Sequence, residues 1–251
     1  MPSRLLLIPA AGPGTRLGAS GPKALAPVLG RPMLDWIADR YASYVDRIVV
    51  VAHPSFAAEI ERWGAARGDL DVLRQDSPTG MLDAILLARP LVERHRPDAI
   101  WITWCDQVAV LPATLDRLAR LDAEHVPALA VPTVHGRDPY THFERDRGGR
   151  ITAVLHRREG DAMPAEGESD MGVFALSRDA FLQLLPQYAL DVVPGRMTRE
   201  RNFVPFVAWA AARGDVVTFP CTDPMEAVGV NTPDDLERVE AWLRARGGEV
   251  R

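Results

Sequence analysis

The sequence is poor in several features that mark particular classes of protein. Its 251 residues include only two cysteines, Cys105 and Cys221, which argues against a disulfide-dense scaffold or a zinc knuckle. The six histidines form no i, i+4 pair and no HExxH pattern, so we predict no zinc site. No apolar run reaches the roughly 18 residues of a membrane span, and the first apolar run is too short for a signal peptide. We therefore expect a cytoplasmic protein.

An excess of basic charge is also missing. The 29 Lys and Arg residues face 34 Asp and Glu residues, which gives a net charge of −5. Proteins that bind nucleic acid or anionic membranes without specificity usually need a clustered basic surface. We therefore expect small-molecule partners, and neither nucleic acid nor a membrane. The content of 47% hydrophobic and 25% charged residues is typical of a globular domain with a buried core.

Lysine itself is almost absent, because Lys23 is the only lysine among the 29 basic residues. The chain uses arginine wherever either side chain serves. A single lysine in such a chain indicates a position that needs a compact ammonium with three donors, which a planar guanidinium does not replace. Chance retention is the alternative. Lys23 is the first candidate for a functional residue.

Strand and helix signals alternate along the first half of the chain. The apolar patterns predict strands at 4–8, 47–51, 72–73, 99–103 and 129–131, with helices at 32–44, 55–67, 81–91 and 112–122 between them. This alternation is typical of an α/β domain with a mostly parallel sheet flanked by helices.

The second half has a different texture. Polar strand-like pieces are expected at 141–144, 151–155 and 172–176, with a charged loop at 157–169, and we interpret this region as an insertion on the substrate side. The chain then returns to a helix at 203–213, strands at 216–219 and 226–230, and a helix that Thr232 caps ahead of Pro233.

A glycine-rich loop follows the first expected strand. Gly12, Gly14 and Gly18 are spaced one residue too widely for the dinucleotide-binding pattern GxGxxG, and no acidic residue ends the second strand. The segment 18–23 also lacks the spacing of a Walker A motif. The loop does offer backbone donors, a hydroxyl at Thr15 and the cations Arg16 and Lys23, a set that suits a triphosphate.

Three nearby segments carry a family resemblance. The letters AAGPGTRL at 10–17, PKALAPV at 22–28 and GRPML at 30–34 resemble the signature of sugar-1-phosphate nucleotidyltransferases, above all the uridylyltransferase domain of N-acetylglucosamine-1-phosphate uridylyltransferases. Segments at 75–80, 104–106 and 225–231 match the family in the same order. The resemblance implies a Rossmann-like three-layer nucleotidyltransferase fold with a mixed, mostly parallel central sheet. It also implies Mg²⁺-dependent transfer of a nucleoside monophosphate from an NTP to a phosphorylated small molecule.

The resemblance further implies roles for individual residues. It assigns Arg16 and Lys23 to catalysis on the triphosphate, and Asp106 and Asn231 to the metal. The position of Asp106 after an apolar strand agrees, because open α/β sheets bind ligands there and oxygen ligands suit Mg²⁺. The nucleotide-binding residues that it implies are Ala10, Ala11, Gly12, Gly14, Thr15, Gln75 and Gly80. We expect one domain over 1–251, with a nucleotide-binding half to about 135, an acceptor-binding half at about 136–225, and a final segment that returns to the metal.

The acceptor-binding segments depart from the family pattern. His156 stands where the N-acetylglucosamine enzymes carry a glutamate, and Asp170-Met-Gly172 replaces Asn-Thr-Gly. We therefore expect His156 and Asp170 to bind a different acceptor. The charged residues between them line the same pocket or form a solvated loop. The six-residue β-helix repeats of the bifunctional enzymes are missing from these residues, so we expect no acetyltransferase activity.

The base and the reaction leave alternatives open. An amide such as Gln75 offers both a donor and an acceptor to a pyrimidine edge, which favours UTP or dTTP. A cytidylyltransferase acting on an alcohol phosphate or phosphonate is one alternative. A nucleotide-sensing domain without catalysis is the other. The sequence carries no signal for oligomeric state.

Overall fold

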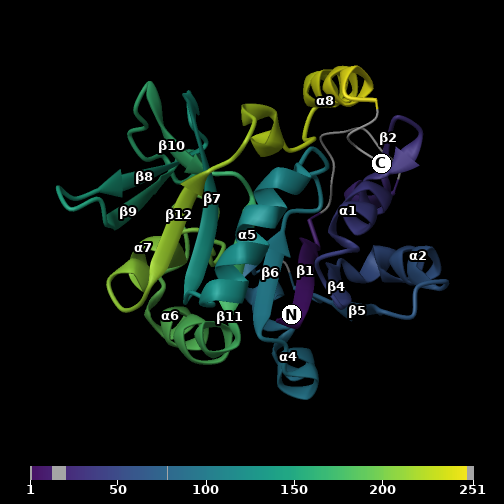
Figure 1. Cartoon of the computed structure of the whole chain (residues 1–251), viewed down its shortest axis with the longest axis horizontal. Coiled ribbons are helices and arrows are strands. Elements are labelled where there is room, and N and C mark those ends of the chain that lie inside the picture. The colour runs from purple at the N-terminus through teal and green to yellow at the C-terminus, as the bar shows by residue number, and fades with distance from the viewer. Residues whose placement is uncertain (1, 13–20, 78, 248–251) are drawn as a thin grey trace.

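A central mixed sheet with helices on both faces forms the body of the molecule (Figure 1). The computed structural model describes residues 2–12, 21–77 and 79–247. Seven strands follow the order β10-β7-β11-β6-β1-β4-β5, and β12 pairs with β7. These strands are β1 (Arg4–Ala10), β4 (Arg47–Ala52), β5 (Leu70–Arg74), β6 (Ala99–Thr103), β7 (Leu129–Arg137), β10 (Glu166–Asp170), β11 (Val173–Ser177) and β12 (Val216–Pro220). The predicted Rossmann-like α/β fold is confirmed.

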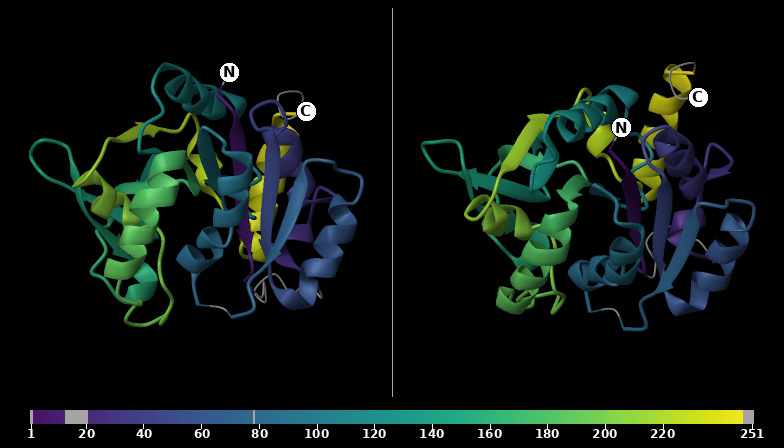
Figure 2. Two further views of the ribbon diagram at one scale, coloured as in Figure 1. Left: turned by 90° about the horizontal axis from the view of Figure 1, so that it is seen from below. Right: turned by 60° about the horizontal axis from the view of Figure 1, so that its bottom comes forward.

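The sheet is parallel in its first half and mixed in its second. β6, β1, β4 and β5 run parallel to one another, whereas β11 runs antiparallel to both β6 and β7. Two small antiparallel pairs lie outside this sheet. They are β2 (Pro27–Val28) with β3 (Arg31–Pro32), and β8 (Thr141–Arg145) with β9 (Ile151–His156). β4 and β5 lie toward one end of the molecule, β6 and β1 near its middle, and β8, β9, β10 and β12 toward the other end (Figures 1 and 2).

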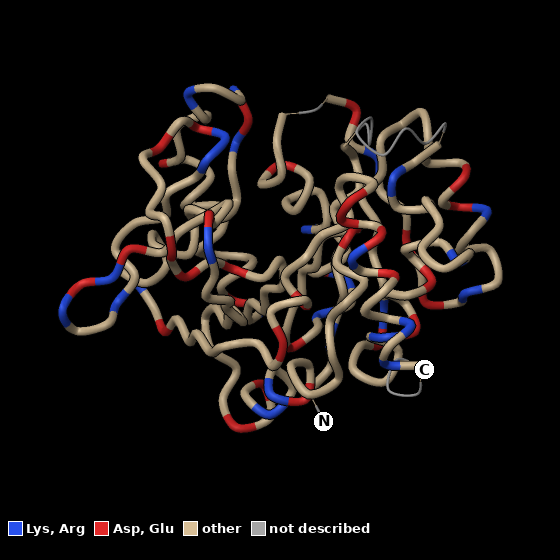
Figure 3. The backbone as a smooth tube through the Cα atoms, turned by 90° about the horizontal axis from the view of Figure 1, so that it is seen from above, with Lys and Arg blue, Asp and Glu red and all other residues tan. Residues whose placement is uncertain are grey.

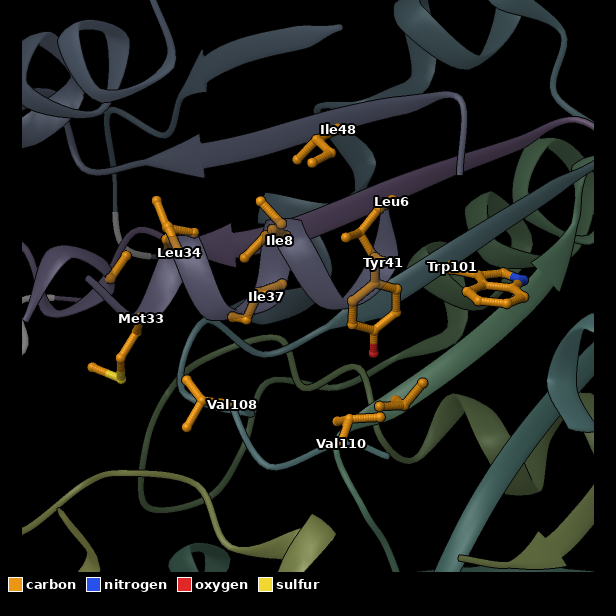
Figure 4. Close-up of a cluster of buried hydrophobic side chains, with 14 of the residues drawn as sticks. Leu6, Ile8, Met33, Leu34, Ile37, Tyr41, Ile48, Trp101, Val108 and Val110 are labelled. Carbon is orange, nitrogen blue, oxygen red and sulfur yellow. The ribbon is translucent and has the colours of Figure 1, made fainter. Parts of the chain in front are cut away.

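Alternate side chains of the buried strands belong to two hydrophobic cores, one on each face of the sheet. All seven residues of β1 are buried; Leu6 and Ile8 belong to one core, and Leu5 and Leu7 to the other. This follows from the two-residue period of a strand in a sheet covered on both faces. Figure 4 shows the first core, with Ile37 and other side chains of α1 packed against β1.

Among the described residues, four α-helices pack on each face of the sheet. The first core contains side chains of α1 (Met33–Tyr41), α2 (Pro54–Gly64), α5 (Pro112–Glu124) and α8 (Pro233–Ala245). The second contains side chains of α3 (Met81–Leu86), α4 (Arg89–His95), α6 (Leu185–Asp191) and α7 (Phe206–Ala211). Within the described ranges, no helix combines the length and apolar character needed to cross a bilayer. Acidic and basic residues are interspersed along the chain, as expected of a solvated surface (Figure 3).

Three local predictions, at 81–91, 157–169 and 226–230, were wrong, and one helical turn was not predicted. The helix expected at 81–91 is two helices, and Pro90 lies in the first turn of α4, where its missing N–H costs no hydrogen bond. The loop expected at 157–169 contains a 3₁₀ turn, η3 (Arg157–Glu159), and the start of β10, which pairs with β7. An unpredicted π-helical turn, η4 (Ala180–Leu184), leads into α6.

The strand expected at 226–230 is instead a 3₁₀ helix, η5 (Pro224–Ala227). The Asp223 side chain caps this helix by accepting from Met225 N, and the Glu226 side chain accepts from Asp223 N. These local hydrogen bonds form in place of strand pairing. The Glu226 side chain is fully buried and also accepts hydrogen bonds from Leu111 N, Thr114 Oγ1 and Thr222 N. This carboxylate therefore fastens the C-terminal segment to the loop before α5.

Candidate active site

The carboxyl ends of the parallel strands meet at one edge of the sheet. Ala10 at the end of β1 pairs with Ala52 at the end of β4, which in turn pairs with Arg74 at the end of β5. Gln75 and Asp106 follow β5 and β6 at the same edge. Open α/β sheets bind their ligands at this edge. Three of the predicted site residues thus share the expected location.

Lys23 lies at the start of η2 (Lys23–Leu25), and its ammonium joins two distant parts of the chain. Its Nζ donates a hydrogen bond to the carboxylate of Asp106 and another, at 2.7 Å, to Oδ1 of Asn231. Only 16% of the Lys23 side chain and 11% of the Asp106 side chain are exposed. The structure therefore brings all three predicted side chains into one largely buried cluster.

The C-terminal segment reaches this cluster through a close backbone approach. Val230 N donates to the carbonyl of Asp106 at 3.1 Å, and Asn231 Nδ2 donates to Gly229 O at 3.2 Å. A Cβ on Gly229 would stand 3.0 Å from Asp106 Cγ, which is closer than carbon atoms normally pack. A side chain at position 229 would therefore press on the Asp106 carboxylate unless that carboxylate shifted by a few tenths of an ångström.

Gln75 is held in place by the segment that follows it. The residue is 8% exposed, its N–H donates to Ala52 O at 3.0 Å, and Nε2 donates to Gly80 O at 3.1 Å. Gly80 has a φ of +125°, and a Cβ there would stand 2.5 Å from Arg201 N. The conformation of this loop therefore depends on glycine and fixes the orientation of the Gln75 amide.

The two predicted acceptor residues lie together at the start of the second half. Thr141 pairs with His156 across the β8–β9 ladder, and its Oγ1 donates to Asp170 at 2.7 Å. Burial lowers the pKa of His156 and raises the pKa of Asp170, although hydrogen bonds from Thr141 and Gly172 oppose the second shift. His156 Nδ1 is buried and has no hydrogen-bond partner among the described residues. This pair is thus set in a poorly solvated environment.

Gly172 connects this pair to the segment that carries Asp106. Its N–H donates to Asp170 Oδ1 at 2.9 Å, and its carbonyl accepts from Trp104 N at 3.2 Å. Gly172 has a φ of +80°, and a Cβ there would stand 2.7 Å from Trp104 Cδ1. Asp170 therefore lies beside the 104–107 segment and is linked to it through one glycine.

Comparison with known proteins identifies the family. Residues 6–171 match the family model of the MobA-like NTP transferase domain, which is well over half of the chain. The chain belongs to this NTP transferase family. The bifunctional protein GlmU of Pseudomonas putida strain GB-1 is 29% identical over 247 residues, which cover 97% of this chain and 52% of that protein. GlmU of Pseudomonas aeruginosa strain LESB58 is 32% identical over 252 residues, with coverage of 96% and 52%. This NTP transferase spans about half the length of the curated relatives that it matches.

The oxygen donors of this NTP transferase fit a hard cation. A carboxylate oxygen of Asp106 and the amide oxygen of Asn231 both point at one cationic atom, Lys23 Nζ. Mg²⁺ prefers such oxygen ligands and takes its remaining ones from water and substrate phosphates. No group of three or more His, Cys, Asp and Glu side chains that could hold a metal occurs in the described part of the chain. A Mg²⁺ held by Asp106 and Asn231 would therefore complete its coordination with oxygen atoms of water and substrate.

Several predicted residues of the NTP transferase receive no structural account. Gly14, Thr15 and Arg16 lie outside the described residues. Ala11 is half-buried, and a Cβ on the exposed Gly12 would meet nothing within 4 Å. Their roles stay predictions.

Sequence reasoning missed two carboxylates. Glu226 and Glu159 are both buried, and each accepts several hydrogen bonds from residues of other segments. The motif around Glu226 was visible as Met225 to Asn231, but the sequence did not show what the carboxylate contacts. Glu159 lay in a segment that resembled a solvated charged loop.

Proposed function

We propose that this NTP transferase moves a nucleoside monophosphate from an NTP, preferably UTP or dTTP, to a sugar 1-phosphate and releases pyrophosphate. The convergence of Lys23, Asp106 and Asn231 at the carboxyl edge of the sheet carries the proposal. The family match and the likeness to GlmU support it. The nucleotide would bind to the half up to about residue 135, and the acceptor to the half at about 136–225.

The reaction is an in-line displacement at the α-phosphorus. A phosphate oxygen of the acceptor forms the new P–O bond, the bond between the α-phosphorus and the bridging oxygen breaks, and pyrophosphate leaves with that oxygen. No side-chain nucleophile takes part. The nearest thiol is poorly suited to that role, because burial and the adjacent Asp106 raise the pKa of Cys105 to about 12.

Charge neutralisation and alignment are the contributions of the protein. Lys23 places a buried ammonium where negative charge gathers on the polyphosphate, and a preorganised charge in a poorly solvated site costs little reorganisation during reaction. Arg16 is proposed to contact the leaving phosphates. Asp106 and Asn231 would hold a Mg²⁺ ion, which supplies further neutralisation of the phosphates when bound. Alignment of the two substrates supplies the rest of the rate acceleration.

Substrate choice rests with residues on either side of this cluster. The fixed amide of Gln75 would read the base, since it offers both a donor and an acceptor. His156 and Asp170 would contact the acceptor beside the 104–107 segment.

A panel of pyrophosphate-release assays tests the proposal. Each of UTP, dTTP, CTP, ATP and GTP is combined with glucose 1-phosphate, N-acetylglucosamine 1-phosphate, phosphocholine and a phosphonate, with and without Mg²⁺. We expect release with UTP or dTTP and a sugar 1-phosphate, and only with Mg²⁺. Release only with CTP and a non-sugar acceptor would replace the proposal by the cytidylyltransferase reading. If no combination released pyrophosphate while the protein still bound an NTP, a nucleotide-sensing function would replace the proposal.

A further inference from the structure

Residues 195–202 form a closed loop that contacts both halves of the molecule; we call it the bridge segment. Gly195 N donates to Glu200 O at 2.8 Å, and Arg199 N donates to Gly195 O at 3.0 Å. Arg199 adopts a φ of +60°, which a residue with a side chain rarely takes. These backbone bonds give the segment a defined shape of its own.

Glu159 anchors the bridge segment to the acceptor-binding half. Its side chain accepts hydrogen bonds from Met197 N at 2.9 Å, Thr198 Oγ1 at 2.5 Å and Asn202 Nδ2 at 3.0 Å. A Cβ on Gly195 would stand 2.2 Å from Glu159 Oε1, so the backbone passes directly against the carboxylate. Every donor in this set comes from the bridge segment, 38 to 43 residues away along the chain.

The charge of Glu159 is maintained by these contacts. Burial would raise its pKa, but the hydrogen bonds from Thr198, Met197 and Asn202 outweigh burial and lower the pKa to about 2. The carboxylate is therefore ionised at neutral pH. A buried anion with three or more donors fixes the geometry of those donors strongly.

A second contact ties the bridge segment to His156. Arg196 Nη2 donates to Glu159 O at 3.1 Å and to Asp161 Oδ1 at 2.6 Å, while Asp161 Oδ2 accepts from His156 N at 2.8 Å. The bridge segment is thus connected to the backbone of a proposed acceptor-binding residue through a single carboxylate.

The other end of the bridge segment holds the loop that positions Gln75. Arg201 N donates to Thr79 O at 2.8 Å, and Leu82 N donates to Arg201 O at 3.1 Å. The Arg201 side chain adds a hydrogen bond to Asp83 Oδ1 at 2.7 Å. The backbone of Arg201 also fills the space that a Cβ on Gly80 would need. Three hydrogen bonds and one close backbone approach therefore hold residues 79–83 against the bridge segment.

We infer that Glu159 is a positioning residue that, through the bridge segment, sets the loop at 79–83 relative to the acceptor-side residues 156–161. Glu159 belongs to the acceptor-side part of the chain, yet its loss loosens the nucleotide-side loop. The link between the halves is a structural claim that needs no ligand. Its effect on nucleotide affinity rests on the proposed function.

Hydrogen–deuterium exchange on Glu159→Gln tests the structural claim. The glutamine amide keeps the shape of the side chain, but its NH₂ group cannot accept the hydrogen bonds that one carboxylate oxygen accepts. The bridge segment therefore loses part of its attachment to residue 159. We expect exchange to quicken at least fivefold both in 195–202 and in 79–87, with β1 and β6 unchanged. Quickening confined to 195–202 would overturn the inference, as would an equal quickening in β1 and β6.

Two further variants keep the test sharp. Glu166→Gln is the matched control, because this carboxylate lies on the same half and pairs on the surface with Arg137, with 57% and 87% of the two side chains exposed. It should leave exchange in 79–87 unchanged. Thr198→Val removes one donor to Glu159 with little change in volume, and should quicken exchange in the same two segments. Failure of Thr198→Val to do so would also count against the inference, even if Glu159→Gln failed to fold.

Titration with UTP and Mg²⁺ extends the test to the nucleotide. We expect Glu159→Gln to raise the dissociation constant and the KM for UTP at least threefold, and to change kcat less than twofold, because Glu159 touches no reacting group. An unchanged dissociation constant in a variant with a loosened 79–87 loop would contradict the link to nucleotide affinity. If the unaltered protein bound no UTP, the proposed function would fail while the exchange result would still decide the inference.

Discussion

Lys23 donates a hydrogen bond to Oδ1 of Asn231 at 2.7 Å, although 208 residues separate the two in the chain. The same ammonium contacts Asp106, so one cation joins the start, the middle and the end of the sequence. The arrangement requires the C-terminal segment to pack against the connection between β1 and α1, where Lys23 lies. Retaining a single lysine in an arginine-rich chain is consistent with a need for such a compact cation.

Replacing Lys23 should reduce turnover much more than stability. Lys23→Ala removes the one ammonium from the site, and loss of a single preorganised charge typically lowers kcat by about 100-fold or more. Lys23→Arg should not restore activity, because a planar guanidinium is larger and holds its donors in a fixed fork, unlike the compact ammonium that contacts Asp106 and Asn231. Pyrophosphate release measures both. Arg89→Ala, at an exposed pair with Glu93, is the control and should keep full activity.

An added methyl group at Gly229 should disturb the position of the Asp106 carboxylate. Gly229→Ala places a methyl group 3.0 Å from Asp106 Cγ, and overpacking of this kind costs about 1–3 kcal/mol. We expect lower activity together with a lower urea midpoint. Gly136→Ala is the matched control, because a Cβ there meets nothing within 4 Å. Equal urea midpoints for Gly229→Ala and Gly136→Ala would show that the site accommodates a methyl group at Gly229 without strain.

Removal of Glu226 should destabilise the C-terminal return. Glu226→Ala leaves four neutral donors without their acceptor, two of them on the buried residues Leu111 and Thr114, and an unsatisfied buried donor typically costs about 1–3 kcal/mol. The free energy of unfolding from urea titration measures the loss. Glu237→Ala, on the exposed side of α8, should change it by less than about 0.5 kcal/mol. A small effect of Glu226→Ala would mean that this network does not hold the segment.

The half-buried His156 should make stability depend on pH. Its pKa in the folded protein is lowered from 6.5, mainly by burial, so below pH 6.5 the unfolded chain binds more protons than the folded one. The free energy of unfolding should therefore fall as the pH drops below 6.5. His156→Gln should flatten this part of the profile, measured by urea denaturation at several pH values. Identical profiles for the two proteins would contradict a lowered pKa.

Local sequence patterns were sufficient to predict the sheet and its ligand-binding edge. Apolar runs with the period of buried strands identified β1, β4 and β6, and the carboxyl-edge rule placed Asp106 after β6, whereas Gln75 came from the family resemblance. These features depend on neighbours within a few residues.

Several features that the sequence did not reveal depend on partners far away in the chain. Glu226 closes the capping box of η5 locally, but it also accepts hydrogen bonds from Leu111 N and Thr114 Oγ1, 115 and 112 residues away. β10 contains glycine and glutamate, which disfavour strands, and it forms because β7 offers an edge to pair with. Glu159 looked like one more charge in a loop, since its donors lie 38 or more residues away. Such contacts leave no periodic trace in a sequence.

The most direct test of the active-site account is the effect of Mg²⁺ on nucleotide affinity in the unaltered protein and in Asp106→Asn. Isothermal titration with UTP, or with the NTP that the assay panel selects, gives both dissociation constants with and without the ion. We expect Mg²⁺ to tighten binding at least tenfold in the unaltered protein and to have little effect in Asp106→Asn. An equal gain from Mg²⁺ in both proteins, or none in either, would contradict a metal and polyphosphate site built on Lys23, Asp106 and Asn231.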